Sequence, residues 1–207
     1  MAEQLVRQPA VAPAELRPRG VRLSERVGLG KIDLRGDPAD RAFMTAVGRV
    51  LDLLLPTEPG ISASKGKITA LWQGPDQWLL TCPADDAAFF INTLRQTLAG
   101  SAIALTEVSD GRIALTLAGP SARDVLAKGC PLDLHPRAFE PGRCAQSLLA
   151  KADVLLHLRA NDPQAGPTFD LYVARSFADY LWTWLEDAGR EYGVQIEPSP
   201  DALPGYA

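Results

Sequence analysis

Short apolar runs and longer amphipathic segments alternate along the chain. Two of the short runs flank Gly74-Pro75-Asp76, and each carries a tryptophan, Trp72 or Trp78. The proline ring fixes φ at a value that suits the second position of a tight turn. Apolar runs of this length on both sides of a turn are typical of strands, so residues 67–81 are predicted to form a β-hairpin.

Segments with helical periodicity lie on both sides of this hairpin. Asp37 followed by Pro38 supplies the N-cap and the first position of a helix, and Gly100 can close the helix that follows Pro83. With two flanking strands, the order is β-α-β-β-α-β. The predicted elements are a strand at 29–34, a helix from Asp37 to Pro56, a loop at 56–66, the hairpin, a helix from Pro83 to Gly100 and a strand at 102–108.

The same order then recurs with one additional strand. In its last helix, Ser176 and Asp179 form a variant of the capping box, and a continuous apolar face follows. That face consists of Phe177, Tyr180, Leu181, Trp184, Leu185 and Ala188. The predicted elements are a strand at 113–118, a helix at 119–129, an irregular segment at 130–142, strands at 143–150, 154–158 and 169–173, a helix from Ser176 and a strand at 194–196.

This repetition predicts the fold class and the domain organisation. We expect an α+β fold of duplicated ferredoxin-like β-α-β-β-α-β units, with antiparallel sheets that helices cover on one face. The units form a single domain over residues 29–197, with halves at 29–108 and 109–197. Residues 1–28, which contain three prolines, are predicted to form an extended arm, and residues 198–207 a loose tail.

Composition narrows the class of protein. The 207 residues are 46% hydrophobic, enough for a substantial core, and their formal net charge of -4 disfavours a nucleic-acid partner. Neither an apolar run long enough to span a membrane nor a signal-peptide pattern occurs. Cys82, Cys130 and Cys144 are widely spaced and odd in number, which indicates free thiols in a reducing compartment. The cytoplasm is therefore the expected location.

The charge is unevenly distributed. Residues 1–26 contain five arginines and three glutamates, a net charge of +2 at the start of an acidic chain. Such a segment suits docking to an acidic partner surface, or is simply a loose chain end. We expect Leu16, Arg17 and Arg19 to contact a partner. Trp182 is a fourth candidate, because it lies off the apolar face of its helix and points toward solvent, a partner or the arm.

No residue is predicted to be catalytic, cofactor-binding or metal-binding. Gly28-Leu29-Gly30-Lys31 lacks the spacing of a phosphate-binding loop. Cys130 and His135 could pair as nucleophile and base, but the segment between them gives no geometric support, and no second ligand pair accompanies them for zinc. Glu107 and Asp110 could meet a ligand, although turn chemistry explains them equally well.

Four segments together resemble a known family. They are Leu29–Gly36 with the helix after it, the hairpin Leu71–Leu80, the stretch Gly119–Pro136, and Phe169–Phe177 with its tryptophan-rich helix. The combination is similar to the gamma subunit of heterotetrameric sarcosine oxidase, from about Leu29 to Gly193. Residues 109–126 are more distantly similar to the folate-binding domain of the glycine-cleavage T-protein, an aminomethyltransferase whose ferredoxin-like units are duplicated.

The resemblance implies a role in a four-chain flavoenzyme that oxidatively demethylates sarcosine to glycine. Such an assembly forms hydrogen peroxide and, with tetrahydrofolate, methylene-tetrahydrofolate. It implies the larger alpha subunit as the main partner, with beta and delta subunits in the same assembly. FAD, FMN, NAD, tetrahydrofolate and zinc are then expected in the partner subunits, and none of them in this chain. The implied role is that of a noncatalytic structural subunit.

Two other functions stay open at this point. A stand-alone folate-binding or aminomethyltransferase-like protein fits the resemblance to the T-protein. However, the loop Pro59-Gly60-Ile61-Ser62 lacks the paired carboxylates of the glycine-rich signature in that family. The other alternative is an iron–sulfur or redox helper that uses the three cysteines.

Overall fold

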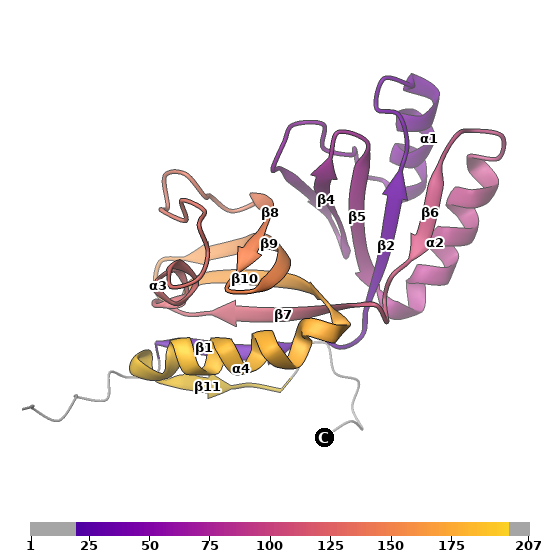
Figure 1. Ribbon diagram of the computed structural model, residues 1–207. Coiled ribbons are helices and arrows are strands. Elements are labelled where there is room, and N and C mark those ends of the chain that lie inside the picture. The colour runs from indigo at the N-terminus through magenta and orange to yellow at the C-terminus, as the bar shows by residue number, and fades with distance from the viewer. Residues whose placement is uncertain (1–19, 199–207) are drawn as a thin grey trace, which may run out of the picture.

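The computed structural model describes residues 20–198, which form two lobes, each a β-sheet with helices packed on one face (Figure 1). We call residues 29–107 the first lobe, and residues 20–28 together with 108–198 the second lobe. No helix in the described part is long and apolar enough to cross a membrane. The α+β class predicted from the sequence is confirmed.

The first lobe has the strand order of a ferredoxin-like unit. Its elements are β2 (Leu29–Arg35), α1 (Arg41–Leu51), β3 (Ser62–Lys65), β4 (Ile68–Gly74), β5 (Gln77–Pro83), α2 (Ala84–Thr97) and β6 (Ala104–Glu107). The sheet order is β3-β4-β5-β2-β6, and every neighbouring pair is antiparallel. Helices α1 and α2 lie side by side on one face of this sheet, over a shared apolar core.

The predicted hairpin is confirmed as β4 and β5, which pair on both sides of the turn at Pro75. Trp78 is fully buried, and its Nε1 donates a hydrogen bond to Pro56 O at 2.7 Å. Because a buried indole N–H without a partner is costly, this bond holds the loop after α1 against the sheet. That loop, predicted to be irregular over residues 56–66, also contributes the short edge strand β3.

Helix α1 begins three residues later than predicted. Its N-cap is Asp40, whose carboxylate accepts hydrogen bonds from Ala42 N at 2.8 Å and from Phe43 N at 3.3 Å. Asp37 instead accepts a hydrogen bond from Ala39 N at 2.8 Å and closes the preceding turn. Both aspartates are suitable caps. From this start, the helix buries Phe43 in the core of the first lobe.

The second lobe repeats this order of elements but takes one strand from the start of the described chain. Its elements are β1 (Val21–Glu25), β7 (Arg112–Ala118), α3 (Ala122–Ala127), β8 (Cys144–Leu149), β9 (Ala152–Asp162), β10 (Gly166–Ala174), the 3-10 turn η1 (Arg175–Phe177), α4 (Ala178–Gly189), the 3-10 turn η2 (Arg190–Tyr192) and β11 (Val194–Ile196). The sheet order is β11-β1-β7-β10-β9-β8, with β1 antiparallel to β7 and parallel to β11.

Strand β1 corrects the prediction of an extended arm over residues 1–28. Val21 and Leu23 are fully buried in the core of the second lobe, because alternate residues of β1 face α3 and α4. In a simple ferredoxin-like unit the last strand pairs with the first, whereas here β1 takes that place and β11 lies at the sheet edge. Residues 1–19 lie outside the described part.

Helix α4 covers the second sheet but leaves part of its apolar face in solvent. Leu181 and Leu185 are buried as predicted, whereas Phe177 is 43% exposed and Tyr180 is 37% exposed. The predicted capping box is wrong, since the N-cap is Phe177 and no side chain caps the helix. Ser176 instead belongs to η1, which leads into α4 from the end of β10.

The irregular segment 130–142 is held in place by Arg123 of α3. The guanidinium donates hydrogen bonds to Leu134 O and, at 3.1 Å, to Phe139 O. It also lies 5.4 Å from the ring centroid of Phe169, where it makes a cation–π contact. A single arginine thus satisfies backbone carbonyls that regular secondary structure would otherwise satisfy.

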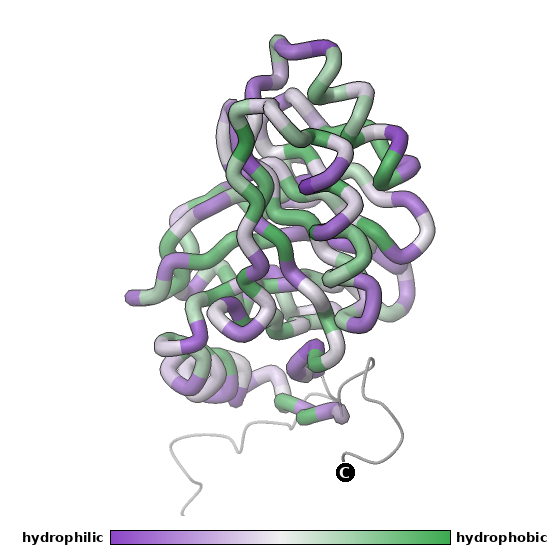
Figure 2. The backbone as a smooth tube through the Cα atoms, turned by 90° about the vertical axis from the view of Figure 1, so that its right-hand side faces the viewer, coloured by the Kyte–Doolittle hydropathy of each residue, from purple (hydrophilic) through white to green (hydrophobic). Residues whose placement is uncertain are grey.

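Apolar side chains of the described residues gather in three clusters. Figure 2 shows that hydrophobic stretches of the backbone, in green, occur in both lobes. One cluster lies under the helices of each lobe. The third lies between the two sheets and consists of the buried residues Leu29, Leu71, Leu79, Ala114, Cys144, Leu155 and Tyr172. The sheet faces that carry no helices therefore pack against each other, and this junction sets how the lobes are joined.

Candidate functional site

The two lobes meet where the loop before β3 runs along β8 of the other sheet. Ser62 N donates a hydrogen bond to Gly142 O at 2.7 Å, and Cys144 N donates one to Gly60 O at 2.9 Å. Gly60 has a φ of +73°, and a Cβ atom there would lie 3.0 Å from Cys144 O, so glycine is required. Backbone hydrogen bonds therefore join the lobes in addition to the apolar cluster.

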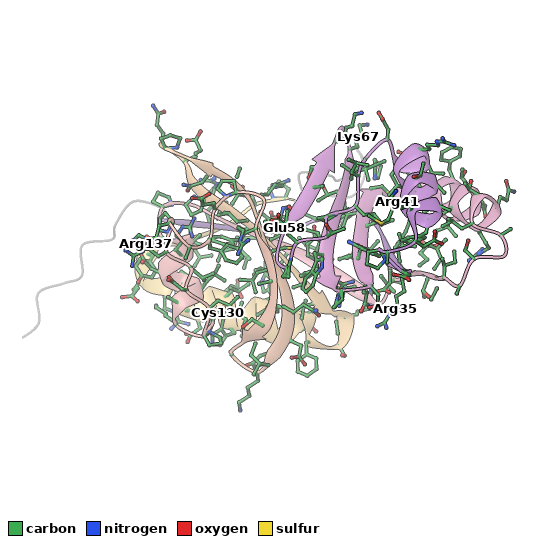
Figure 3. All side chains as sticks on the ribbon, turned by 90° about the horizontal axis from the view of Figure 1, so that it is seen from above. Arg35, Arg41, Glu58, Lys67, Cys130 and Arg137 are labelled. Atoms are coloured by element: carbon green, nitrogen blue, oxygen red, sulfur yellow. The ribbon has the colours of Figure 1, made fainter. Side chains whose placement is uncertain are left out.

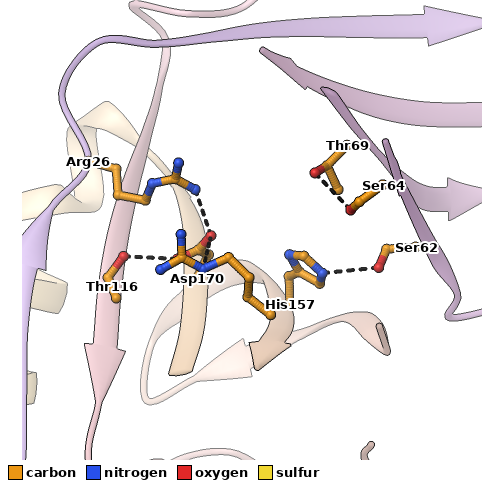
Figure 4. A network of polar contacts seen from close by, with 8 residues as sticks. Arg26, Ser62, Ser64, Thr69, Thr116, His157 and Asp170 are labelled. Atoms are coloured by element: carbon orange, nitrogen blue, oxygen red, sulfur yellow. Dashed lines mark hydrogen bonds and ion pairs between the residues drawn. The ribbon is translucent and has the colours of Figure 1, made fainter. Parts of the chain in front are cut away.

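A buried carboxylate lies near this contact, on the face of the second sheet that looks toward the first lobe (Figure 4). Asp170 of β10 is fully buried and accepts hydrogen bonds from Arg26 Nη1 at 2.8 Å and Thr116 Oγ1 at 2.8 Å. Arg159 Nε lies 3.7 Å from the same carboxylate. Buried charges require such partners, so these contacts hold the turn after β1 against β7, β9 and β10.

Strand β9 brings His157 to the same face, opposite Asp170 in the pairing of β9 with β10. His157 Nε2 lies 3.0 Å from Ser62 Oγ, which in turn donates to Gly142 O at 2.8 Å. A carbonyl can only accept, so the single serine hydrogen points to Gly142 and His157 Nε2 must be the donor to Ser62. Burial lowers the pKa of His157 to about 4, which keeps the imidazole neutral.

This arrangement is the reverse of a hydrolytic triad. In a triad the histidine accepts the serine proton, and a carboxylate holds the hydrogen on Nδ1. Here His157 Nδ1 is buried without a hydrogen-bond partner among the described residues, while Asp170 is bound by Arg26 and Thr116. Ser62 is therefore not activated as a nucleophile, and the Ser62–His157 pair acts as a hydrogen bond between the lobes.

Burial shifts other titratable groups at the junction toward their neutral forms. It raises the pKa of Cys144 to about 11, raises the pKa of Tyr172 and lowers the pKa of Lys31. The Lys31 ammonium donates a hydrogen bond to Leu29 O at 2.8 Å. Because the thiolate is the nucleophilic form of cysteine, a raised pKa makes Cys144 unreactive. These groups suit a packed junction better than a reaction centre.

A second polar bridge crosses the junction at Gln73 of β4. Arg112 Nη1 of β7 donates to Gln73 Oε1 at 2.6 Å, and Gln146 Nε2 of β8 donates to Gln73 O at 2.7 Å. Gln73 Nε2 donates in turn to Asp33 Oδ2 of β2 at 3.1 Å. Two strands of the second lobe thus bind one residue of the first lobe, and the directions of these bonds restrict how the lobes can rotate against each other.

The sequence candidates Cys130 and His135 have separate partners. Figure 3 shows Cys130 inside the second lobe, where it is buried and its Sγ lies 3.9 Å from Ser147 Oγ. His135 is exposed, and its Nδ1 accepts a hydrogen bond from Arg137 N at 3.3 Å. The structure therefore does not combine the two as nucleophile and base. Within residues 20–198, no group of three or more His, Cys, Asp or Glu side chains is placed to hold a metal ion.

The candidates at the connection between the lobes have roles in turns. Ser109 Oγ accepts a hydrogen bond from Lys31 N at 3.0 Å and donates one to Glu107 Oε1 at 3.0 Å. Gly28 has a φ of +79° in the turn before β2, and Leu29–Lys31 begin that strand. The interpretation of Glu107 as part of a turn is therefore supported. Gly28 and Gly30 precede or lie in a strand, whereas the glycines of a phosphate-binding loop lead into a helix.

Of the predicted partner contacts, Leu16, Arg17 and Arg19 lie outside the described residues. Trp182 is half-buried and packs against the core of the second lobe. Core packing therefore accounts for much of its surface, and its place at an interface stays a prediction.

Sequence reasoning did not find the polar contacts of the junction, although part of their signal was present. Asp170 is a lone carboxylate inside an apolar strand, and His157 interrupts another apolar run. Such residues need partners when they are buried. Their partners Arg26 and Ser62 lie 144 and 95 residues away in sequence, so no local spacing could identify them.

Comparisons with known proteins agree with the resemblance seen in the sequence. The model of the sarcosine oxidase, gamma subunit family matches residues 35–191. The sarcosine oxidase subunit gamma of Arthrobacter sp. is 35% identical over 194 residues, which cover 91% of this chain and 92% of that protein.

Solved structures extend this agreement to the fold. A chain of the heterotetrameric sarcosine oxidase from Corynebacterium sp. U-96, in complex with pyrrole 2-carboxylate, matches with a TM-score of 0.77 and 29% identity, over 89% of this chain and 92% of that one. The glycine cleavage system aminomethyltransferase T from Bartonella henselae shares the fold alone, with a TM-score of 0.59 and 15% identity over 89% of this chain and 48% of that one. The family model and the Arthrobacter relative together show that the chain belongs to the sarcosine oxidase gamma subunit family.

Proposed function

We propose that this chain is the gamma subunit of a heterotetrameric sarcosine oxidase and that its role there is structural. The observation that carries the proposal is the match of the family model over residues 35–191, together with the likeness to a chain of the Corynebacterium enzyme. The larger alpha subunit is the main partner, and the beta and delta subunits complete the assembly. The assembly as a whole oxidatively demethylates sarcosine to glycine.

The geometry of the junction supports a structural role. The one Ser–His pair described there has its hydrogen bond directed away from catalysis, and the buried carboxylate beside it is already bound by Arg26 and Thr116. Burial raises the pKa of both Cys82 and Cys144 to about 11, which argues against a redox helper that uses them.

The same proposal assigns the cofactors and the location. FAD, FMN, NAD, tetrahydrofolate and zinc belong to the partner subunits, and this chain supports the subunits that hold them. We assign the assembly to the cytoplasm, where thiols stay reduced, in keeping with the three free cysteines.

Co-expression of the chain with the other three subunits tests the proposal. We expect the chain to co-purify with the alpha subunit in a complex that oxidises sarcosine. The isolated chain is expected to leave sarcosine and other N-methyl amines unchanged. Turnover of such an amine by the isolated chain would contradict the structural role.

A tetrahydrofolate titration of the isolated chain tests the alternative of a stand-alone folate-binding or aminomethyltransferase-like protein. Saturable binding at micromolar concentration, measured by calorimetry, would favour that alternative. We expect no saturable binding, because the proposal assigns tetrahydrofolate to a partner subunit.

A further inference from the structure

Helix α4 and its N-cap present a row of aromatic side chains that the core of the second lobe covers only in part. Phe177, Tyr180 and Trp184 are spaced three and four residues apart, so they lie along one face of the helix. Phe177 is 43% exposed, Tyr180 is 37% exposed, and Trp184 is partly buried. We call these three residues the α4 stripe.

Each ring of the α4 stripe has a contact within the chain. The rings of Phe177 and Tyr180 form an edge-to-face pair with centroids 6.4 Å apart, and Tyr180 Oη accepts a hydrogen bond from Lys151 N at 3.3 Å. Trp184 lies so close to Gly129 that a Cβ atom there would come within 2.6 Å of the indole. Because such contacts limit the rotamers of the rings, binding to them loses less conformational entropy, which is typical of aromatic anchors at interfaces.

Acidic side chains border the α4 stripe. A surface groove of about 620 Å³ runs along the helix, and its lining includes Tyr180 and Trp184. Asp179, Glu186 and Asp187 line the same groove, against a single cation, Arg190, which pairs with Asp187 at 3.2 Å. The groove therefore combines aromatic faces with excess negative charge, the surroundings that an arginine guanidinium prefers.

We propose that the groove along α4 is the surface by which this chain binds the larger subunit, and that its occupant is an apolar segment carrying arginine. This inference rests on the proposed function, and it names the surface through which the chain would bind its partner. The arginine forms ion pairs with the carboxylates while its guanidinium lies on the exposed aromatic edges, and the apolar part of the segment covers Phe177.

The first lobe offers matched positions that lie outside the proposed surface. Phe89 of α2 is 63% exposed and contacts Phe90 in an edge-to-face pair, much as Phe177 contacts Tyr180. Asp85 lies in the first turn of α2, as Asp179 lies in the first turn of α4. These two residues therefore supply control positions of the same residue type and in the same kind of element.

The test compares Phe177→Ser and Asp179→Lys with the controls Phe89→Ser and Asp85→Lys. Affinity of each full-length variant for the purified alpha subunit is measured by biolayer interferometry, with thermal melting to confirm that each variant is folded. We expect Phe177→Ser to weaken binding about tenfold and Asp179→Lys about fivefold, with the controls within about twofold of the wild type. Added salt should weaken binding of the wild type more than binding of Asp179→Lys.

The outcomes separate this inference from the proposed function. If the wild-type chain does not bind the alpha subunit, the proposed function fails, and the inference fails with it. If the wild type binds but both α4 variants bind equally well, only the inference is overturned. It is also overturned if the α4 variants instead abolish self-association of the chain, or if α4 amides are as protected from hydrogen exchange in the isolated chain as in the complex.

Discussion

The two lobes share an order of elements but differ in how each is completed. The first lobe takes all five strands of its sheet from residues 29–107, and Asp40 caps its first helix. The second lobe includes β1, whose residues precede the first lobe in the sequence, and its helix α4 begins without a side-chain cap. It also buries a fully enclosed carboxylate, Asp170, whereas the nearest counterpart in the first lobe, Asp33, is 21% exposed in its side chain.

This difference indicates which lobe depends on contacts between residues that are far apart in the sequence. Every strand pairing of the first lobe lies within the continuous segment of residues 29–107. The second lobe depends on contacts across the whole chain, such as that of Arg26 with Asp170. Its completed sheet then presents α4 at the surface.

The largest expected effect is at the buried carboxylate. Asp170→Ala leaves Arg26 with an uncompensated charge and Thr116 without its acceptor, so the free energy of unfolding should fall by about 3–5 kcal/mol. Asp33→Ala removes a partly exposed carboxylate that binds Gln73 and Gln77, and it should cost about 1 kcal/mol. Urea denaturation measures both. Equal losses would contradict the contrast between the lobes.

Acidification should weaken the junction through His157. Its pKa is about 4 in the folded chain, below the ordinary value of 6.5, so the unfolded chain binds more protons between these pH values. The stability from the neutral ring is present above pH 6.5 and is lost as the pH falls toward 4, by about 3 kcal/mol. Denaturation across this range should show a shallower loss in His157→Gln than in the wild type. The exposed His135→Gln control should follow the wild type.

A smaller effect is expected at the hydrogen bond between the lobes. Ser62→Ala removes the contacts with Gly142 O and His157 Nε2 and should lower the free energy of unfolding by about 1–2 kcal/mol. Ser64→Ala on the same strand removes only an exposed contact with Thr69 and should change it by less than about 0.5 kcal/mol. If the two variants unfold at the same urea concentration, the bond between the lobes contributes nothing to stability.

The smallest effect distinguishes the helix starts of the two lobes. Asp40→Ala removes the side-chain cap of α1 and should cost about 1 kcal/mol. Ser176→Ala should leave the stability nearly unchanged, because Ser176 caps no helix. Thermal melting of both variants checks this. A clear loss in Ser176→Ala would restore the capping box expected from the sequence.

Local patterns predicted most of the elements and the α+β class, but not strand β1 or the junction between the lobes. The hairpin at Pro75 and the closing strand β11 follow from turn chemistry and periodicity. The strand Val21–Glu25 was not expected, because five residues near a proline-rich segment give too short an alternation to show their pairing with β7. The junction could not be predicted either, since the partners of Asp170 and His157 are far apart in sequence and only the folded chain brings them together.

Native mass spectrometry of the four co-expressed subunits tests the central claim most directly. The account predicts that the chain is incorporated once per complex beside the alpha, beta and delta subunits, and that the complex oxidises sarcosine while the chain alone does not. A chain that stays apart from the other three subunits while they form an active enzyme without it would contradict the account.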